Sequence, residues 1–90
     1  MRVKDLKVGK RYDLTFKWGY LDKLFYDGLC DSLGGRQCDC CGKSLENGHV
    51  FKETNDFVSY EDCVNGDYLN QYFVGTTCIK KLGIEQSTEK

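Results

Sequence analysis

Residues 37–45 read QCDCCGKSL and place three cysteines within four positions. Cys38 and Cys41 form a C-x-x-C-G pattern with Gly42. This spacing lets two thiolates reach one tetrahedral ion at about 2.3 Å, and the glycine supplies a turn conformation that bulkier residues resist. The stretch therefore predicts a zinc knuckle, which is one half of a metal site, and a fold built around that site.

The second half of the site has to come from elsewhere in the chain. Residues 75–83 read GTTCIKKLG, which predicts a short helix with a threonine at its start and Gly83 after its end. Cys78 would lie in the first turn, where the amide dipoles favour a thiolate. We therefore expect Zn²⁺ to be held by Cys38, Cys41 and Cys78, together with one further ligand.

Several residues compete for the fourth position. Cys63 is favoured because it is a soft ligand in the polar sequence EDCVNG, which is typical of an exposed turn. His49, the only histidine, and Cys30, on the apolar side of a predicted helix, are the alternatives. Cys40 stands between two ligands and is predicted to face away from the ion. The predicted metal ligands are thus Cys38, Cys41, Cys63 and Cys78.

Length and cysteine content favour a metal-stabilised domain. Ninety residues with six cysteines predict one domain that benefits from a cross-link, because so short a chain buries a limited core. Residues 1–17 lack a signal-peptide core, and no apolar run is long enough to span a bilayer. We therefore expect a cytoplasmic protein with reduced thiols. A disulfide framework is the alternative, whereas a redox C-x-x-C site lacks its usual βαβ setting.

Apolar periodicity predicts an α+β fold. Residues 12–16 alternate apolar and polar side chains and predict a strand. From Trp18 onwards, apolar residues recur every three or four positions, which predicts a helix over 19–33. Further strands are expected over 48–54, 57–61 and 68–74. The single domain, 1–90, would consist of an N-terminal strand and helix (1–37), a zinc-binding unit (38–84) and a tail (85–90).

The order of these features resembles a treble-clef zinc finger, in which a C-x-x-C-G knuckle, a β-hairpin and a ligand-bearing helix follow one another. More narrowly, CDCCGKSL and YFVGTTCIKKL resemble a small cysteine-bearing protein type encoded by bacteriophages. The resemblance covers residues 38–82 and implies a treble-clef-like, zinc-stapled unit. A treble-clef helix usually supplies a second ligand three residues after the first, where this chain has Lys81, so the fourth ligand stays open.

The sequence contains no recognisable catalytic pattern. The treble clef underlies HNH-type nucleases, whose chemistry needs a pair of histidines, and this chain has His49 alone. It has no G-x-S-x-G, P-loop or H-E-x-x-H pattern. We therefore expect a protein that is not an enzyme, in which zinc stabilises the fold.

The distribution of charge separates two binding roles. Residues 1–17 carry six basic and two acidic side chains, whereas the other 73 carry seven basic and twelve acidic ones. The acidic part favours a protein-interaction module, in the phage setting one that binds and modulates a host or viral protein. The alternative is a nucleic-acid-binding finger that uses the basic N-terminal arm, from Arg2 to Lys17. We expect no membrane partner, and the sequence indicates no oligomeric state.

Overall fold

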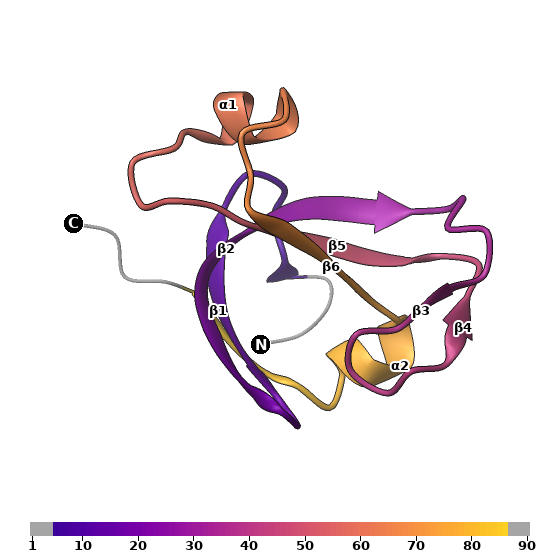
Figure 1. Cartoon of the computed structure of the whole chain (residues 1–90). Helices are drawn as coiled ribbons and strands as arrows, with labels where there is room; N and C mark the ends of the chain where they lie inside the picture. The colour runs from indigo at the N-terminus through magenta and orange to yellow at the C-terminus, as the bar shows by residue number, and fades with distance from the viewer. Residues whose placement is uncertain (1–4, 87–90) are drawn as a thin grey trace.

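The computed structural model describes residues 5–86 and contains a curved antiparallel sheet, a two-stranded ribbon and two short helices (Figure 1). The sheet has the order β6-β5-β2-β1-β7, and every neighbouring pair is antiparallel. Its strands are β1 (Arg11–Phe16), β2 (Gly19–Cys30), β5 (Gly48–Glu53), β6 (Asn70–Val74) and β7 (Gly83–Gln86). The α+β prediction is thus confirmed in its coarse form, as a small fold of antiparallel strands with two short helices and a cysteine cluster.

The N-terminal part of the chain forms a long hairpin. β1 confirms the strand expected over residues 12–16, but the helix expected over 19–33 is wrong. Those residues form β2, which pairs with β1 on one side and with β5 on the other. β2 is therefore the central strand of the sheet, and β1 is an interior strand as well, because β7 covers its other side.

Two β-bulges explain why β2 resembles a helix in sequence. One bulge places Asp22 and Lys23 opposite the single residue Asp13 of β1, and the other inserts Asp27 opposite β5. Lys23 has a φ of 55°, and its amide donates to the Asp13 carboxylate at 3.0 Å. In a regular strand, every second side chain lies on the same face. Each inserted residue increases this spacing to three residues at the bulge. The apolar residues on that face of β2 are therefore Leu21, Leu24, Tyr26 and Leu29.

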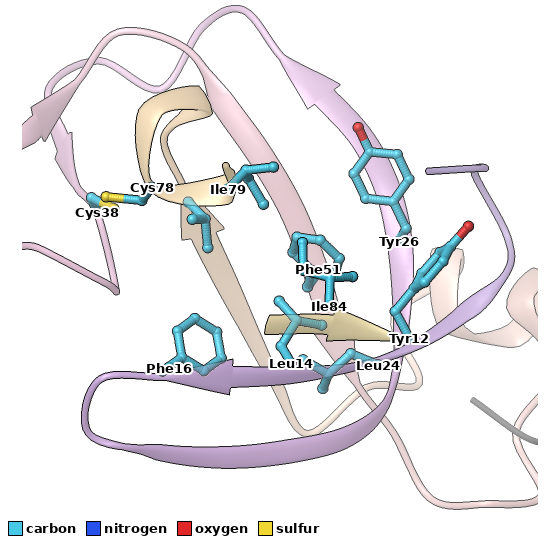
Figure 2. Close-up of a cluster of buried hydrophobic side chains, with 11 residues drawn as sticks. Tyr12, Leu14, Phe16, Leu24, Tyr26, Cys38, Phe51, Cys78, Ile79 and Ile84 are labelled. Atoms are coloured by element: carbon cyan, nitrogen blue, oxygen red, sulfur yellow. The ribbon is translucent and has the colours of Figure 1, made fainter. Parts of the chain in front are cut away.

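One face of the sheet carries the hydrophobic core. Alternate residues of the strands pack there with side chains from the second helix and from the cysteine-bearing loop. The buried cluster consists of Tyr12, Leu14, Phe16, Leu24, Tyr26, Cys38, Phe51, Val74, Cys78, Ile79 and Ile84. Figure 2 shows Cys38 and Cys78 at one end of this cluster, so the cysteines and the core form one continuous interior.

Helix α1 (Tyr60–Val64) covers the opposite face of the sheet. The Ser59 hydroxyl caps the helix by accepting a backbone N–H of its first turn at 3.2 Å. Phe25 of β2, which points away from the core, meets the Tyr60 ring at a centroid distance of 5.6 Å. The strand expected over 57–61 is therefore wrong, because the serine cap starts a helical turn within it.

The two-stranded ribbon lies near the second helix (Figure 1), at the end of the molecule that carries the cysteine cluster, here called the cysteine end. β3 (Arg36–Gln37) pairs with β4 (Ser44–Leu45), and the loop between them carries three of the six cysteines. Leu45 and Cys40 pack against the core cluster from this side. The ribbon thus attaches the cysteine-bearing loop to the core face of the sheet.

The C-terminal part returns to the sheet. The strands expected over 48–54 and 68–74 are confirmed as β5 and β6, and α2 (Thr76–Ile79) confirms a shorter form of the expected helix. β7 then pairs with β1, so the predicted tail over 85–90 begins within a strand, and residues 87–90 lie outside the described part. Among residues 5–86, no helix is long and apolar enough to cross a membrane.

Candidate metal centre

The loop between β3 and β4 has the geometry of a knuckle. The Cys38 amide donates to the Lys43 carbonyl at 2.8 Å, and the Gly42 amide donates to the Cys38 carbonyl at 2.8 Å. Gly42 has a φ of 79°, in the left-handed region that favours glycine. The turn brings the sulfur atoms of Cys38 and Cys41 together, as the C-x-x-C-G pattern predicts.

Asp39 fixes the knuckle on the sheet. Its amide donates to the Phe73 carbonyl at 2.8 Å, and its carboxylate accepts the Phe73 amide at 2.7 Å. The indole N–H of Trp18, in the turn between β1 and β2, donates to the Asp39 carbonyl at 2.8 Å. One residue therefore connects the knuckle with β6 and with the β1–β2 hairpin, a role that no sequence pattern indicates.

Cys78 completes a cluster of three thiols. The sulfur atoms of Cys38, Cys41 and Cys78 lie within 4.8 Å of one another, and Figure 2 shows those of Cys38 and Cys78 facing each other. The sulfur atoms around a tetrahedral zinc ion lie about 3.8 Å apart. Binding an ion therefore requires the three sulfur atoms to move only slightly closer together. The Gly75 amide, at the start of α2, donates to the Cys38 sulfur at 3.5 Å, an interaction that favours a thiolate.

The thiols of the cluster differ in acidity. The Lys43 backbone N–H, followed by the Cys78 thiol, lowers the pKa of Cys41, which is exposed to solvent. Burial, followed by the neighbouring thiols, raises the pKa of Cys78 to about 12. Cys41 is therefore ionised before Cys78, and Cys78 holds a proton that a metal ion has to displace.

Cys40 lies closer to the cluster than the sequence predicts. Its thiol is half-buried against the core, and it is one of the groups whose hydrogen bonding raises the pKa of Cys78, after burial and the thiols of Cys41 and Cys38. Cys40 is not one of the three residues whose sulfur atoms all lie within 4.8 Å of one another.

The structure does not bring Cys63 to this cluster. Cys63 is completely buried on α1, on the other face of the sheet, and its charged neighbours include Lys52, Asp27 and Arg11. Burial raises the pKa of its thiol. Cys63 is therefore a buried helix position, although its neighbours in EDCVNG are exposed as expected.

His49 and Cys30 have other surroundings as well. The Nδ1 atom of His49 lies 2.7 Å from the Tyr26 hydroxyl, and its Nε2 atom lies 3.3 Å from the Thr76 hydroxyl. Both ring nitrogens thus have partners, and burial lowers the pKa of His49. Cys30 ends β2 opposite Gly48 and is not part of the three-thiol cluster.

Comparison with models of known protein families, with curated proteins and with solved structures finds no match to this chain. The chemistry of the centre therefore has to be inferred from its geometry. Thiolate ligands arranged around one point suit soft or borderline ions with tetrahedral coordination, of which Zn²⁺ is the usual one in proteins. The cluster of Cys38, Cys41 and Cys78 is compatible with such an ion.

Proposed function

We propose that this protein is a small zinc-binding module whose metal ion stabilises the fold. The observation that carries the proposal is the cluster of Cys38, Cys41 and Cys78 at the end of the core. Elemental analysis of protein purified under reducing conditions tests it, with one zinc per chain expected and unfolding expected on chelation. A preparation without stoichiometric metal, or a mass that shows three disulfides, contradicts the proposal.

We propose Cys40 as the fourth ligand. Its half-burial and its contact with Cys78 support this assignment, and the partners of His49 and the location of Cys63 disfavour the other candidates. Four thiolates close the coordination shell, as in structural zinc sites. In cobalt-substituted protein, Cys40→Ser should lower the sulfur-to-cobalt absorption by about a quarter, while the control Cys63→Ser should not. A loss in Cys63→Ser instead would restore the ligand set expected from sequence.

A treble-clef-like architecture is part of this proposal. The knuckle is followed by the antiparallel pair β5–β6 and then by α2, which carries Cys78, and this is the order of a treble clef. Two features differ, because α1 is inserted between the strands and α2 carries one cysteine. From the motifs CDCCGKSL and YFVGTTCIKKL we also propose a relation to the phage-encoded protein type, and with it a location in the cytoplasm of a host cell.

We further propose that the module binds a protein and catalyses no reaction. Residues 53–67, which include α1, contain five carboxylates and no lysine or arginine. Phe57 in this segment is fully exposed, and Val64 is 50% exposed. Exposed apolar side chains in a segment rich in carboxylates give an interaction site both an apolar anchor and a charge that selects basic partners. The expected partner is a host or viral protein that presents a basic surface with an apolar pocket.

A pull-down from host lysate tests this role. We expect a partner that is retained after nuclease treatment and lost with Phe57→Ala, because exposed aromatic anchors often carry a large part of the binding energy. Leu29→Ala is the matched control, since Leu29 is 53% exposed on the other face of the sheet. Loss of all partners after nuclease treatment would favour nucleic-acid binding instead.

The nucleic-acid alternative through the N-terminal arm has less support. The Arg11 guanidinium is buried, donates to the carbonyls of Lys23 at 2.6 Å and Val58 at 2.9 Å, and stacks over Phe25 at 3.9 Å. It is therefore committed to the fold. Lys7 and Lys10 are exposed, and Arg2 and Lys4 lie outside the described residues.

A further inference from the structure

A cavity of about 810 Å³ opens at the cysteine cluster, and Cys38, Cys40, Cys41 and Cys78 are among its lining residues. Its walls come from the end of β1 and the turn after it, the knuckle, β4, α2 and the residues that lead to β7. This volume is in the range of pockets that hold small organic ligands. A metal ion on the cysteines would use a small part of the volume, so the cavity has room for a second ligand.

The charge of the cavity differs from that of the whole chain. Lys17, Lys43 and Lys81 line it from three separate segments, and no aspartate or glutamate is among its lining residues. The full chain, by contrast, has 14 acidic and 13 basic residues. Three lysines around one cavity without a carboxylate create a positive potential that attracts anions.

The positive charge of the three lysines exceeds the negative charge that a zinc–thiolate centre would carry. Zn²⁺ with four thiolates carries two negative charges, and with three thiolates it carries one. Lys17, Lys43 and Lys81 together exceed either value. The cavity beside the metal therefore retains positive charge, which an additional anionic group would neutralise.

The cavity also offers an apolar wall next to an exposed aromatic ring. Phe16, Leu45 and Leu82 line it. Trp18 stacks on Phe16 with the ring centroids 4.7 Å apart and the planes 10° apart, and it remains 55% exposed. An aromatic ligand ring therefore finds both an apolar contact and a stacking partner near the lysines.

We propose that this cavity binds a phosphate-bearing small molecule with an aromatic ring, of the mononucleotide class. The lysines contact the phosphate groups, and the ring lies against the apolar wall that includes Phe16, next to the exposed Trp18 that stacks on Phe16. The inference rests on the proposed zinc site, because the metal would fix the knuckle and α2 relative to each other. The same phosphate chemistry occurs in a nucleic-acid strand, and the experiment has to separate the two sources.

Titration of the zinc-loaded protein with ADP tests the proposal. Trp18 is the only tryptophan, so its fluorescence reports binding at the cavity. We expect a saturable change with ADP that weakens as salt rises, and weaker binding of inorganic pyrophosphate, which lacks the ring. A single-stranded oligothymidylate of ten residues should bind no more tightly than ADP.

Lysine variants connect the binding to the cavity. The triple variant Lys17→Gln, Lys43→Gln, Lys81→Gln should lower the affinity for ADP by about tenfold or more, because it removes all three charge-assisted contacts. Lys81→Gln alone should weaken binding, whereas Lys80→Gln, its neighbour outside the cavity, should not. The far-ultraviolet circular dichroism of each variant shows whether it is folded.

Defined results would overturn the inference. These are the absence of saturable ADP binding, pyrophosphate binding as tight as that of ADP, an affinity that the triple variant leaves unchanged, or binding of the oligonucleotide alone. Zinc content measured on the same samples separates this inference from the proposed function. If zinc-loaded protein does not bind ADP, only the proposed ligand binding in the cavity is refuted. If folded, zinc-free protein binds ADP, only the proposed zinc site is refuted.

Discussion

The acidities of individual thiols determine how the candidate centre would bind a metal. Cys41 is predisposed to ionise because the Lys43 backbone N–H stabilises its thiolate. Cys78 is buried between other thiols, and its pKa is raised to about 12. At neutral pH, the metal-free site therefore holds at least one proton that coordination has to release.

Zinc affinity should consequently rise with pH between 6 and 8. Each thiol proton that is displaced adds up to about tenfold in apparent affinity per pH unit. Competition with a chromophoric chelator at several pH values measures this dependence. Cys30→Ser should leave the dependence intact, because Cys30 lies outside the cluster. An affinity that does not change with pH would show that the thiols are already ionised in the metal-free protein.

His49 makes stability depend on pH in the acidic range. Burial lowers its pKa below the ordinary value of 6.5. The unfolded chain therefore binds a proton at a higher pH than the folded chain does, and stability is lost as the pH falls below about 6.5. Urea unfolding at pH 7.5 and 5.5 should show a larger loss for the wild type than for His49→Gln. Equal losses would mean that this histidine does not contribute, because zinc release affects both proteins alike.

At the scale of elements, α1 is held on the sheet by a hydrogen bond from Tyr60 to Asp27, a carboxylate that also forms a partly buried ion pair between β2 and β5. The Lys52 ammonium lies 3.1 Å from the Asp27 carboxylate, which also accepts the Tyr60 hydroxyl at 2.5 Å. Asp27 is the residue inserted at a bulge of β2, so the bulge directs its side chain toward the helix. Burial, followed by Asp27, raises the pKa of Tyr60 to about 12, so Tyr60 stays a hydrogen-bond donor at neutral pH.

Removing this carboxylate should destabilise the fold. Asp27→Ala leaves the Lys52 charge largely buried without its partner, which costs about 3 kcal/mol. Asp56→Ala is the matched control, because Asp56 pairs with Lys23 at 3.4 Å in an exposed position and should cost less than about 1 kcal/mol. Urea unfolding of both variants measures the difference. Similar costs would show that the pair beneath α1 is solvated.

The strand β1 and the knuckle agree with the local sequence pattern, whereas β2 and α1 do not. The alternation in β1 and the knuckle spacing around Gly42 involve neighbouring residues only. β2 was predicted as a helix because its bulges reset the alternation and produce steps of three. No rule based on neighbours detects a bulge, since its position is set by the partner strand.

The same distinction applies to the metal centre. The clustering of Cys38, Cys41 and Cys78 could be predicted because each stands in a local motif with a known geometry. The surroundings of Cys63 and Cys40 depend on how distant segments pack. A polar sequence around Cys63 indicated exposure, yet α1 buries it against the sheet.

At the scale of the whole molecule, the two proposed binding regions lie on opposite faces of one sheet. β5 runs from the cysteine end toward the segment that leads to α1 (Figure 1). The acidic segment around α1 packs on the face that carries Phe25, and the cation-lined cavity lies beside the core face. A protein partner and a phosphate-bearing ligand could therefore be bound at the same time.

Both regions should nevertheless depend on the metal. Cys38 and Cys78 belong to the same buried cluster as Leu14 of β1 and Phe51 of β5, which is the only core cluster seen in residues 5–86. Loss of the ion would therefore loosen one side of this core. We therefore expect chelation to unfold the domain in one cooperative transition, as zinc-dependent domains do. Hydrogen exchange followed by mass spectrometry measures this in zinc-loaded and chelated protein.

The decisive comparison is between the knuckle, which carries two of the clustered cysteines, and α1, which carries none of them. If zinc stabilises the whole fold, amides of 38–43 and of 60–64 should lose protection together when the chelator is added, and re-addition of zinc should restore both. The Cys30→Ser protein serves as a control with an intact cluster and should behave like the wild type. If 60–64 kept their protection while 38–43 and 76–79 exchanged freely, the metal would organise only the cavity end. Partner binding through Phe57 should then survive chelation, and the zinc site would serve the ligand cavity instead of the fold.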